Sequence, residues 1–206
     1  MMKIYVDIDD VLARTIESLI DLLDETHGRR VDVEAVRHFD LEKSFDLSDD
    51  EIFAFMERAH TDDALERIEP VAEGIRTLED WRGDGHEVHL VTGRPPAANA
   101  ASRRWLERHA VPHVALHHLD KWSRPTWNEA GLPALAFDEL GAMAFDFAVE
   151  DSLDTAVRLV EEFALPVALM DRPWNRDLSG VAPATRARLT RCVGWAPVAG
   201  MMAALR

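Results

Sequence analysis

Cysteine is almost absent from this chain of 206 residues, which contains only Cys192. A single thiol can build neither an intrachain disulfide framework nor a zinc site made of several thiolates from one chain. Disulfide-stapled secreted scaffolds and cysteine-based zinc modules are therefore excluded. The composition fits a protein of the reducing cytoplasm.

Long apolar runs are also lacking. The residues before Asp7 do not form the longer apolar stretch of a signal peptide. The apolar stretch 193–205 contains Pro197 and is too short to span a bilayer. We therefore expect a cytoplasmic protein that is neither secreted nor held in a membrane. No internal repeat or low-complexity tract is visible.

Positive charge is scarce, because 23 Lys and Arg face 38 Asp and Glu and leave a formal net charge of −15. A chain of this charge is repelled by polyanions, so nucleic-acid polymers and anionic membrane surfaces are poor partners. Residues 14–73 hold 18 of the acidic and seven of the basic side chains. Most of the negative excess therefore belongs to one segment.

Apolar residues, in contrast, make up 47% of the chain, which is enough for a sizeable core and excludes a disordered protein. Short apolar segments alternate with amphipathic helical patterns. This alternation is typical of a parallel sheet covered by helices on both faces, and so of the α/β class. The expected strands are 4–6, 88–91, 114–116, 145–149 and 166–170.

The alternation is interrupted after the first strand. The next strand should follow within roughly 30 residues in a simple βαβ unit, yet helical patterns occupy 15–25, 33–39 and 48–60 instead. Ser48 and Glu51 have the spacing of a capping box at the start of the third helix. We therefore interpret 14–73 as a small helical insertion into a core formed by 1–13 and 74–206.

Two carboxylates follow the first strand. Residues i and i+2 of a strand share a face, so Asp7 and Asp9 are expected to project together. Their repulsion is relieved by a shared proton or by a hard cation, above all Mg²⁺. Asp10 is expected to cap the following helix. The alternative is that acidic residues simply end a strand at a loop.

The second strand is followed by Thr92, Gly93 and Arg94. A hydroxyl, a glycine that lets backbone N–H groups approach a ligand, and a helix start form a cradle suited to phosphate. An ordinary turn between a strand and a helix is the alternative.

Lys121 and Asp151 each follow a later strand. Lysine occurs only three times in the chain, and its ammonium is a point charge that can bridge a carboxylate and a phosphate oxygen. An unselected surface lysine is the alternative, with Arg124 as a substitute. Asp151, preceded by Glu150, can supply a further metal ligand or can instead belong to the start of a helix.

All four positions lie at the carboxyl ends of expected parallel strands, where open α/β sheets bind ligands. This combination resembles the haloacid dehalogenase-like phosphohydrolase superfamily. The four motifs of that superfamily match Asp7-x-Asp9, Thr92-Gly93-Arg94, Lys121 and Glu150-Asp151. Together with 171–175, they look most like the group of 5′(3′)-deoxyribonucleotidases and related nucleotidases.

The resemblance implies a Rossmann-like core with a helical cap at 14–73 and a Mg²⁺-dependent reaction. Asp7 would attack phosphorus and form an aspartyl phosphate, while Asp9 would serve as general acid and base. Mg²⁺ would be held by the Asp7 carboxylate, the Asp9 carbonyl and Asp151. Thr92, Gly93 and Lys121 would bind the phosphoryl group, and Arg94 and Arg172 are candidates for substrate contacts.

The implied substrate is a small phosphorylated metabolite, with a nucleoside 5′-monophosphate favoured. Two alternatives stay open: a phosphatase of a sugar phosphate or other small ester, and a catalytically silent protein that binds Mg²⁺ and a ligand. A signalling receiver is disfavoured, because its phosphorylated Asp follows a later strand than the acidic pair. An oligomer is compatible with the sequence.

Other side chains of the insertion are ambiguous. Aromatic and methionine side chains there could stack a base, although their helical spacing favours the insertion's own core; they are Phe39, Phe45, Phe53, Phe55 and Met56. His38 and His60 are expected on the surface. A pocket-lining role for the later histidines is a weaker alternative; these are His113, His117 and His118.

Overall fold

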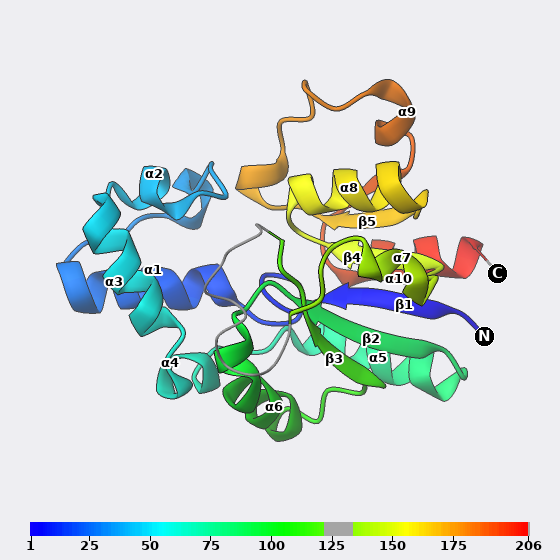
Figure 1. Ribbon diagram of the computed structural model, residues 1–206, viewed down its shortest axis with the longest axis horizontal. Helices are drawn as coiled ribbons and strands as arrows, with labels where there is room; N and C mark the ends of the chain where they lie inside the picture. The colour runs from blue at the N-terminus through cyan, green and yellow to red at the C-terminus, as the bar shows by residue number, and fades with distance from the viewer. Residues whose placement is uncertain (122–133, 206) are drawn as a thin grey trace.

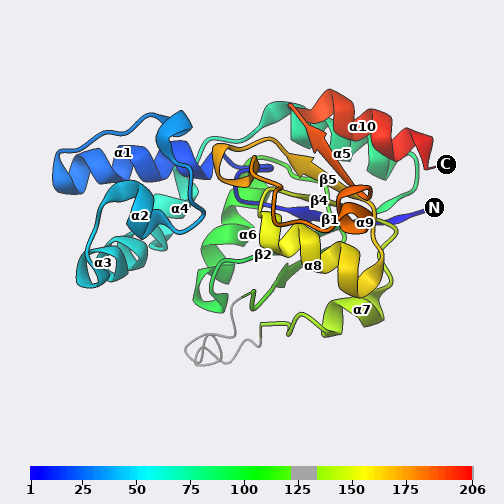
Figure 2. The ribbon, with the colours of Figure 1, turned by 90° about the horizontal axis from the view of Figure 1, so that it is seen from above.

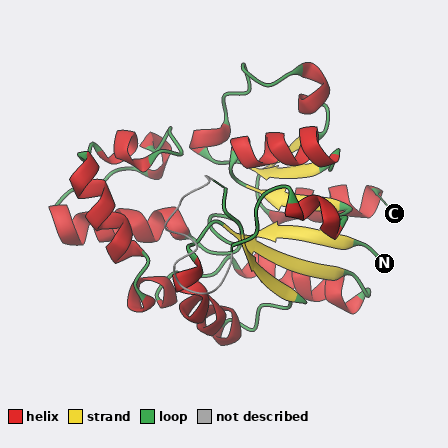
Figure 3. Ribbon diagram, viewed as in Figure 1, coloured by secondary structure: helices red, strands yellow, loops and turns green. Residues whose placement is uncertain are grey.

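A computed structural model describes residues 1–121 and 134–205. Within them, six parallel strands form one sheet in the order β3-β2-β1-β4-β5-β6, which confirms the α/β prediction. Figure 3 shows this sheet in yellow among the red helices. The strands are β1 (Lys3–Asp7), β2 (Glu87–Thr92), β3 (Ala115–His118), β4 (Phe147–Glu150), β5 (Val167–Met170) and β6 (Leu189–Cys192). The chain moves from one side of β1 to the other after β3, and β1 therefore lies at the switch point where such sheets bind ligands.

Helices cover both faces of the sheet, as the apolar strands require. Ile4 and Val6 pack in the same buried cluster as residues of α5, α6 and α10, whereas Tyr5 points to the opposite face and joins the cluster of α7 and α8. Figure 2 shows α5 and α10 on one side of β1 and α8 on the other. These helices and the short helix α9 span Ala72–Gly83 (α5), Asn99–Arg108 (α6), Glu139–Met143 (α7), Leu153–Phe163 (α8), Pro183–Arg186 (α9) and Trp195–Ala204 (α10).

Four further helices lie beyond the carboxyl end of β1 (Figure 1). They are α1 (Thr15–His27), α2 (Leu41–Phe45), α3 (Asp49–Ala59) and α4 (Asp62–Glu66). Residues of α1, α2 and α3 form a hydrophobic cluster of their own, whereas Leu65 of α4 belongs to the cluster of the core. The expected capping box is present at α3, where Ser48 N donates to Glu51 Oε2 over 2.9 Å and Glu51 N donates to Ser48 Oγ over 3.4 Å. The boundaries 14–73 of this unit stay a prediction.

The two passages of the chain between these helices and the sheet lie side by side. Arg14 N donates to the carbonyl of Glu69 over 2.8 Å, and Val71 N donates to the carbonyl of Leu12 over 2.7 Å. Ala13 and Pro70 form an antiparallel bridge between the two passages. Short backbone ties of this kind fix where the helical group leaves and rejoins the core.

The helix expected at 33–39 is wrong. Only one 3-10 turn forms there, η1 (Val33–Ala35), and the side chain of Asp32 caps it by accepting a hydrogen bond from Glu34 N. β-Branched residues favour extended backbone, and the following Val36 is fully buried in the core of the helical group. Burial of this side chain takes the place of a second turn of helix.

Two strand predictions also differ from the structure. The third strand begins at Ala115, because Val114 is 49% exposed and only its backbone N–H joins the sheet, by donating to Val88 over 2.7 Å. The edge strand β6 was not expected. Its middle residues, Thr190 and Arg191, are polar, so β6 carries no apolar run to announce it. In residues 1–121 and 134–205, no helix is long and apolar enough to cross a membrane.

Gly74 marks a close approach of α5 to α10. An added Cβ would lie 2.7 Å from Trp195 Cε2 and 2.9 Å from Leu12 Cδ2, and Trp195 is anchored by donating to the carbonyl of Val11. Gly74→Ala is therefore expected to lower the free energy of unfolding by about 1–3 kcal/mol through overpacking, as measured by urea unfolding.

The matched control is Gly83→Ala in the last turn of the same helix, where no atom of the described residues lies within 4 Å of the added Cβ. Alanine favours helix over glycine by up to about 1 kcal/mol, so this control should leave stability unchanged or slightly raise it. Equal losses in the two variants would contradict the close approach.

Candidate active site

Asp7 is the last residue of β1 and is almost completely buried, with 2% exposure. The chain turns sharply beyond it, because the backbone N–H groups of Leu12 and Ala13 both donate to the carbonyl of Ile8. Asp10 adopts a left-handed backbone with φ of 56° in this turn. The turn holds the acidic residues at the carboxyl end of the central strand.

Asp10 caps the first helix, as expected, since its Oδ1 accepts a hydrogen bond from Ile16 N over 3.0 Å. Burial raises the pKa of this carboxyl to about 7, against the opposing effects of the Arg172 guanidinium and the Ile16 N–H. Arg172 itself donates to the carbonyl of Asp10 through Nε over 3.1 Å. Arg172 thus supports the turn after β1 and is absent from the described residues that line the cavity; its contact with substrate stays a prediction.

The carboxylate of Asp9 accepts hydrogen bonds from three side chains. Its Oδ1 accepts from Thr15 Oγ1 over 2.7 Å and from Arg94 Nη2 over 2.7 Å, and its Oδ2 accepts from Thr92 Oγ1 over 3.2 Å. Burial raises the pKa of Asp9, but the Arg94 charge and the hydrogen bonds from Arg94 and Thr15 outweigh it and hold the pKa below its ordinary value. Asp9 is therefore an anion at neutral pH.

Thr92 ends β2 beside Asp9 and is fully buried. Besides donating to Asp9, its hydroxyl accepts a hydrogen bond from Arg94 N over 3.1 Å. Gly93 lines the same cavity as Asp9. The structure thus brings Thr92 and Gly93 to the acidic pair, and phosphate binding by them remains a proposal.

Lys121 lies against Asp7, although it follows the end of β3 by three residues. Its Nζ is 3.3 Å from Asp7 Oδ1 and 2.6 Å from Glu150 Oε1, and its side chain is only 6% exposed. A buried ammonium between two carboxylates offsets part of their mutual repulsion. The substitute candidate Arg124 lies outside the described residues.

Glu150 holds this lysine in place. Its Oε1 also accepts from the hydroxyl of Tyr5 over 3.2 Å, while its Oε2 accepts from the backbone N–H groups of Asp151 and Ser152 over 2.7 and 3.1 Å. Both oxygens are therefore fixed by protein donors. Tyr5 was not predicted here; it is the only tyrosine in the chain, a signal that could have singled it out.

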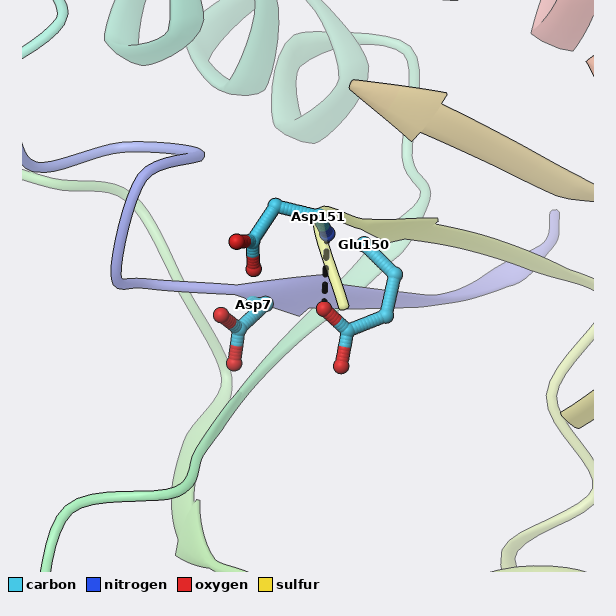
Figure 4. A group of neighbouring side chains, drawn as sticks. All are labelled: Asp7, Glu150 and Asp151. Atoms are coloured by element: carbon cyan, nitrogen blue, oxygen red, sulfur yellow. Dashed lines mark hydrogen bonds between the residues drawn. The ribbon is translucent and has the colours of Figure 1, made fainter. Parts of the chain in front are cut away.

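Asp7, Glu150 and Asp151 form a compact carboxylate group at the ends of β1 and β4, with one oxygen of each lying within 4.8 Å of the others. In Figure 4, Glu150 turns back toward the backbone nitrogen of Asp151. Burial raises the pKa of Asp7, which Lys121 opposes and Glu150 reinforces. Burial, Glu150 and Asp7 likewise raise the pKa of Asp151.

This donor set fits a hard divalent cation. Two buried carboxylates whose charged forms are disfavoured by burial and by each other are stabilised as anions when a cation joins them, and Mg²⁺ prefers such oxygen ligands. Asp7 and Asp151 suit this role better than Glu150, whose oxygens already accept protein hydrogen bonds. The carboxylate of Asp9 is outside the group, and a contribution from its carbonyl remains a prediction.

Trp174 and Asn175, in the short helix η4 (Pro173–Asn175), fix Asp151 from the other side. Trp174 Nε1 donates to Asp151 Oδ2 over 3.0 Å, and Asn175 Nδ2 donates to the carbonyl of Asp151 over 2.7 Å. These contacts were not predicted, although the segment 171–175 contributed to the resemblance. Their partner lies more than 20 residues away, and sequence spacing gives no sign of it.

A cavity of about 810 Å³ joins these carboxylates to the helical group. Phe39, Met56 and Trp174 line it, whereas Phe45 and Phe55 pack edge to face in the core of the helical group and Phe53 is 67% exposed. The expectation of the insertion's own core is thus correct for Phe45 and Phe55.

His38 is exposed, as expected, and His60 is partly exposed; both of these histidines line the cavity, which was not expected of them. His117 stacks on His89 with ring centroids 5.3 Å apart, and His118 bonds to the carbonyl of Arg94. Among the described residues that line the cavity, neither of these strand histidines is found.

No family model matches the sequence. Over 160 residues, the chain is 27% identical to a curated protein of Halalkalibacterium halodurans named "Putative nucleotidase", in an alignment covering 77% of this chain and 74% of that protein. The name of this relative agrees with the nucleotidase group that the four motifs resemble.

Solved structures show the same fold. A predicted phosphatase of Clostridium acetobutylicum superposes with a TM-score of 0.67 over 98% of both chains at 10% identity. A HAD family hydrolase of Deinococcus radiodurans, solved with bound phosphate and sodium, superposes with a TM-score of 0.63 over 100% of this chain and 96% of that one at 14% identity. The motifs, the sheet and these relatives support a hydrolase similar to the haloacid dehalogenase-like superfamily and, within it, to the nucleotidase-like group.

Proposed function

We propose that the protein is a Mg²⁺-dependent phosphatase that hydrolyses a small phosphomonoester, with a nucleoside 5′-monophosphate as the favoured substrate. The observation that carries the proposal is the meeting of Asp7, Lys121 and Asp151 at the carboxyl end of the central strand, next to Asp9. A nucleophile, a cation and a metal-binding carboxylate are the parts that phosphoryl transfer requires.

In the first half of the proposed reaction, Asp7 attacks phosphorus in line. Lys121 contacts Oδ1 of Asp7, and we assign the attack to Oδ2. A bond forms between this oxygen and phosphorus while the bond from phosphorus to the leaving oxygen breaks, which gives an aspartyl phosphate. In this proposal, Lys121 and the hydroxyl of Thr92 contact phosphoryl oxygens.

In the proposed reaction, Asp9 donates a proton to the leaving alcohol and later accepts one from water. A dianionic phosphoryl group beside Asp9 raises the pKa of its carboxyl by like-charge repulsion, so that Asp9 can carry a proton to the leaving alcohol. As a carboxylate, Asp9 then takes a proton from the water that attacks phosphorus, which releases phosphate and regenerates Asp7. Mg²⁺, held by Asp7 and Asp151, would neutralise charge on the transferring group.

The cavity supports a small leaving group. It opens from the carboxylates toward the helical group and carries both apolar side chains and acidic ones, such as Leu19 and Asp21 of α1. A nucleoside matches such a mixed wall, and a sugar or another small alcohol is the second candidate. The name of the Halalkalibacterium relative favours the nucleoside.

The test is phosphate release from a panel of nucleoside 5′-monophosphates, nucleoside 3′-monophosphates, hexose phosphates and glycerol phosphate. We expect release that stops with excess chelator and returns with added Mg²⁺, and a ranking led by the 5′-nucleotides. A ranking led by sugar esters would replace the substrate class. No release from any ester with Mg²⁺ present would contradict the enzyme and leave the silent binding protein.

A further inference from the structure

Arg94 was expected to contact substrate, and in the structure its guanidinium donates hydrogen bonds to the carboxylate of Asp9. Nε lies 3.1 Å from both carboxylate oxygens of Asp9, and Nη2 lies 2.7 Å from Oδ1. The third nitrogen, Nη1, donates to Ser102 Oγ over 3.2 Å. Each of the three guanidinium nitrogens thus contacts a side chain of the protein.

Burial separates the two partners of this ion pair. Both residues line the cavity, but the Arg94 side chain is 2% exposed, whereas that of Asp9 is 25% exposed. The accessible surface of the ion pair therefore belongs mainly to the carboxylate, and nearly all of the guanidinium is covered by protein.

The backbone of Arg94 is anchored as well. Its N–H donates to the Thr92 hydroxyl over 3.1 Å, and its carbonyl accepts from His118 Nδ1 over 2.9 Å. Ser102, which holds Nη1, is fully buried in α6. A planar guanidinium fixed at both ends imposes its geometry on a carboxylate that it contacts through two nitrogens.

We propose that Arg94 is a positioning residue that holds the carboxylate of Asp9 in the orientation from which it exchanges a proton with the leaving oxygen. The inference rests on the proposed phosphatase function and concerns a step that the other residues of the site do not supply. Loss of this alignment should slow departure of the leaving group without weakening phosphate binding, since misplacement of a reacting group by about 1 Å can cost on the order of 100-fold in rate.

The experiment uses the full chain with Mg²⁺ and two esters, uridine 5′-monophosphate, whose alkoxide needs a proton to leave, and p-nitrophenyl phosphate, whose phenolate does not. For Arg94→Met we expect kcat/KM to fall about 100-fold on the nucleotide and less than about tenfold on the aryl ester. The inhibition constant of inorganic phosphate should stay within about threefold. Arg94→Lys should recover part of the loss on the nucleotide.

Two further variants keep the test sharp. Ser102→Ala removes the anchor of Nη1 without touching Asp9 and should show the same leaving-group dependence to a smaller degree. Arg103→Met, an exposed arginine on the same helix, should match the wild type. Equal losses on both esters, or an inhibition constant of phosphate raised tenfold or more, would overturn the positioning role, the latter in favour of substrate binding.

A readout without activity separates this inference from the proposed function. If the wild type hydrolyses no ester, the phosphatase proposal fails, and the contact is tested by thermal unfolding of Arg94→Met, Asp9→Asn and the double variant. Coupled side chains give a double variant whose midpoint shift is clearly smaller than the two single shifts together. Additive shifts would contradict the contact itself.

Discussion

Asp7→Asn is expected to abolish phosphate release, with a loss of at least about 10⁴-fold in kcat, the order found when a covalent nucleophile is removed. An amide oxygen cannot form the acyl phosphate, and the amide also withdraws one anionic ligand from the proposed Mg²⁺ site. The measurement is steady-state phosphate release on the best ester of the panel.

Stability should move in the other direction or stay unchanged. Burial, Glu150 and Asp9 all disfavour the charged form of Asp7, so the isosteric amide relieves repulsion, and Lys121 keeps its 2.6 Å contact with Glu150. A melting temperature at or above that of the wild type thus accompanies the loss of activity. Asp80→Asn, an exposed carboxylate on α5, is the matched control. Retention of a tenth or more of the activity by Asp7→Asn would rule out Asp7 as the nucleophile.

Lys121→Met is expected to reduce both stability and activity. The variant leaves the buried Glu150 and Asp7 without the cation between them, and removing one partner of a buried ion pair costs about 3–5 kcal/mol. Phosphate release should fall as well, because Lys121 contacts Asp7, the proposed nucleophile. Urea unfolding and the phosphatase assay check the two effects separately.

The matched control is Lys43→Met, whose ammonium pairs with Asp40 on the surface and is 62% exposed. A surface pair of this kind contributes at most about 1 kcal/mol. Lys121→Arg keeps the charge and should restore most of the stability but less of the activity, because a bulkier planar cation fills a point-charge position poorly. Unchanged stability in Lys121→Met would contradict a buried role for this lysine.

Most of the sheet was predictable because its strands are buried on both faces. Segment 166–170 is apolar throughout, segment 88–91 is apolar except for His89, and five of the six strands follow from such short apolar runs. The edge strand β6 did not, since one side of it has no neighbouring strand and its residues can be polar. The sequence pattern also predicted a helix that continues through Val36. In the structure the turn ends before this residue, whose side chain is buried.

Part of the site was predictable because its polar side chains directly follow strands of the sheet. Asp7, Thr92 and Asp151 each follow an apolar run, and the parallel sheet places such ends together. The contacts of Tyr5 and Trp174 could not be predicted, because each depends on a partner distant in sequence. Arg94 was expected at this site, but its ion pair with Asp9 could not be predicted from the sequence.

The paired passages at Leu12–Ala13 and Pro70–Val71 have a consequence for how such a protein can diversify. An insert whose two ends meet in one short antiparallel tie closes a loop on a fixed base, and lengthening such a loop costs only about 0.6 kcal/mol for each doubling. A helical insert of another size can therefore replace this one between the two paired passages while the register of the sheet stays the same. Under the proposed function, the preference for the leaving alcohol can then change by replacement of the insert, independently of the reaction at phosphorus.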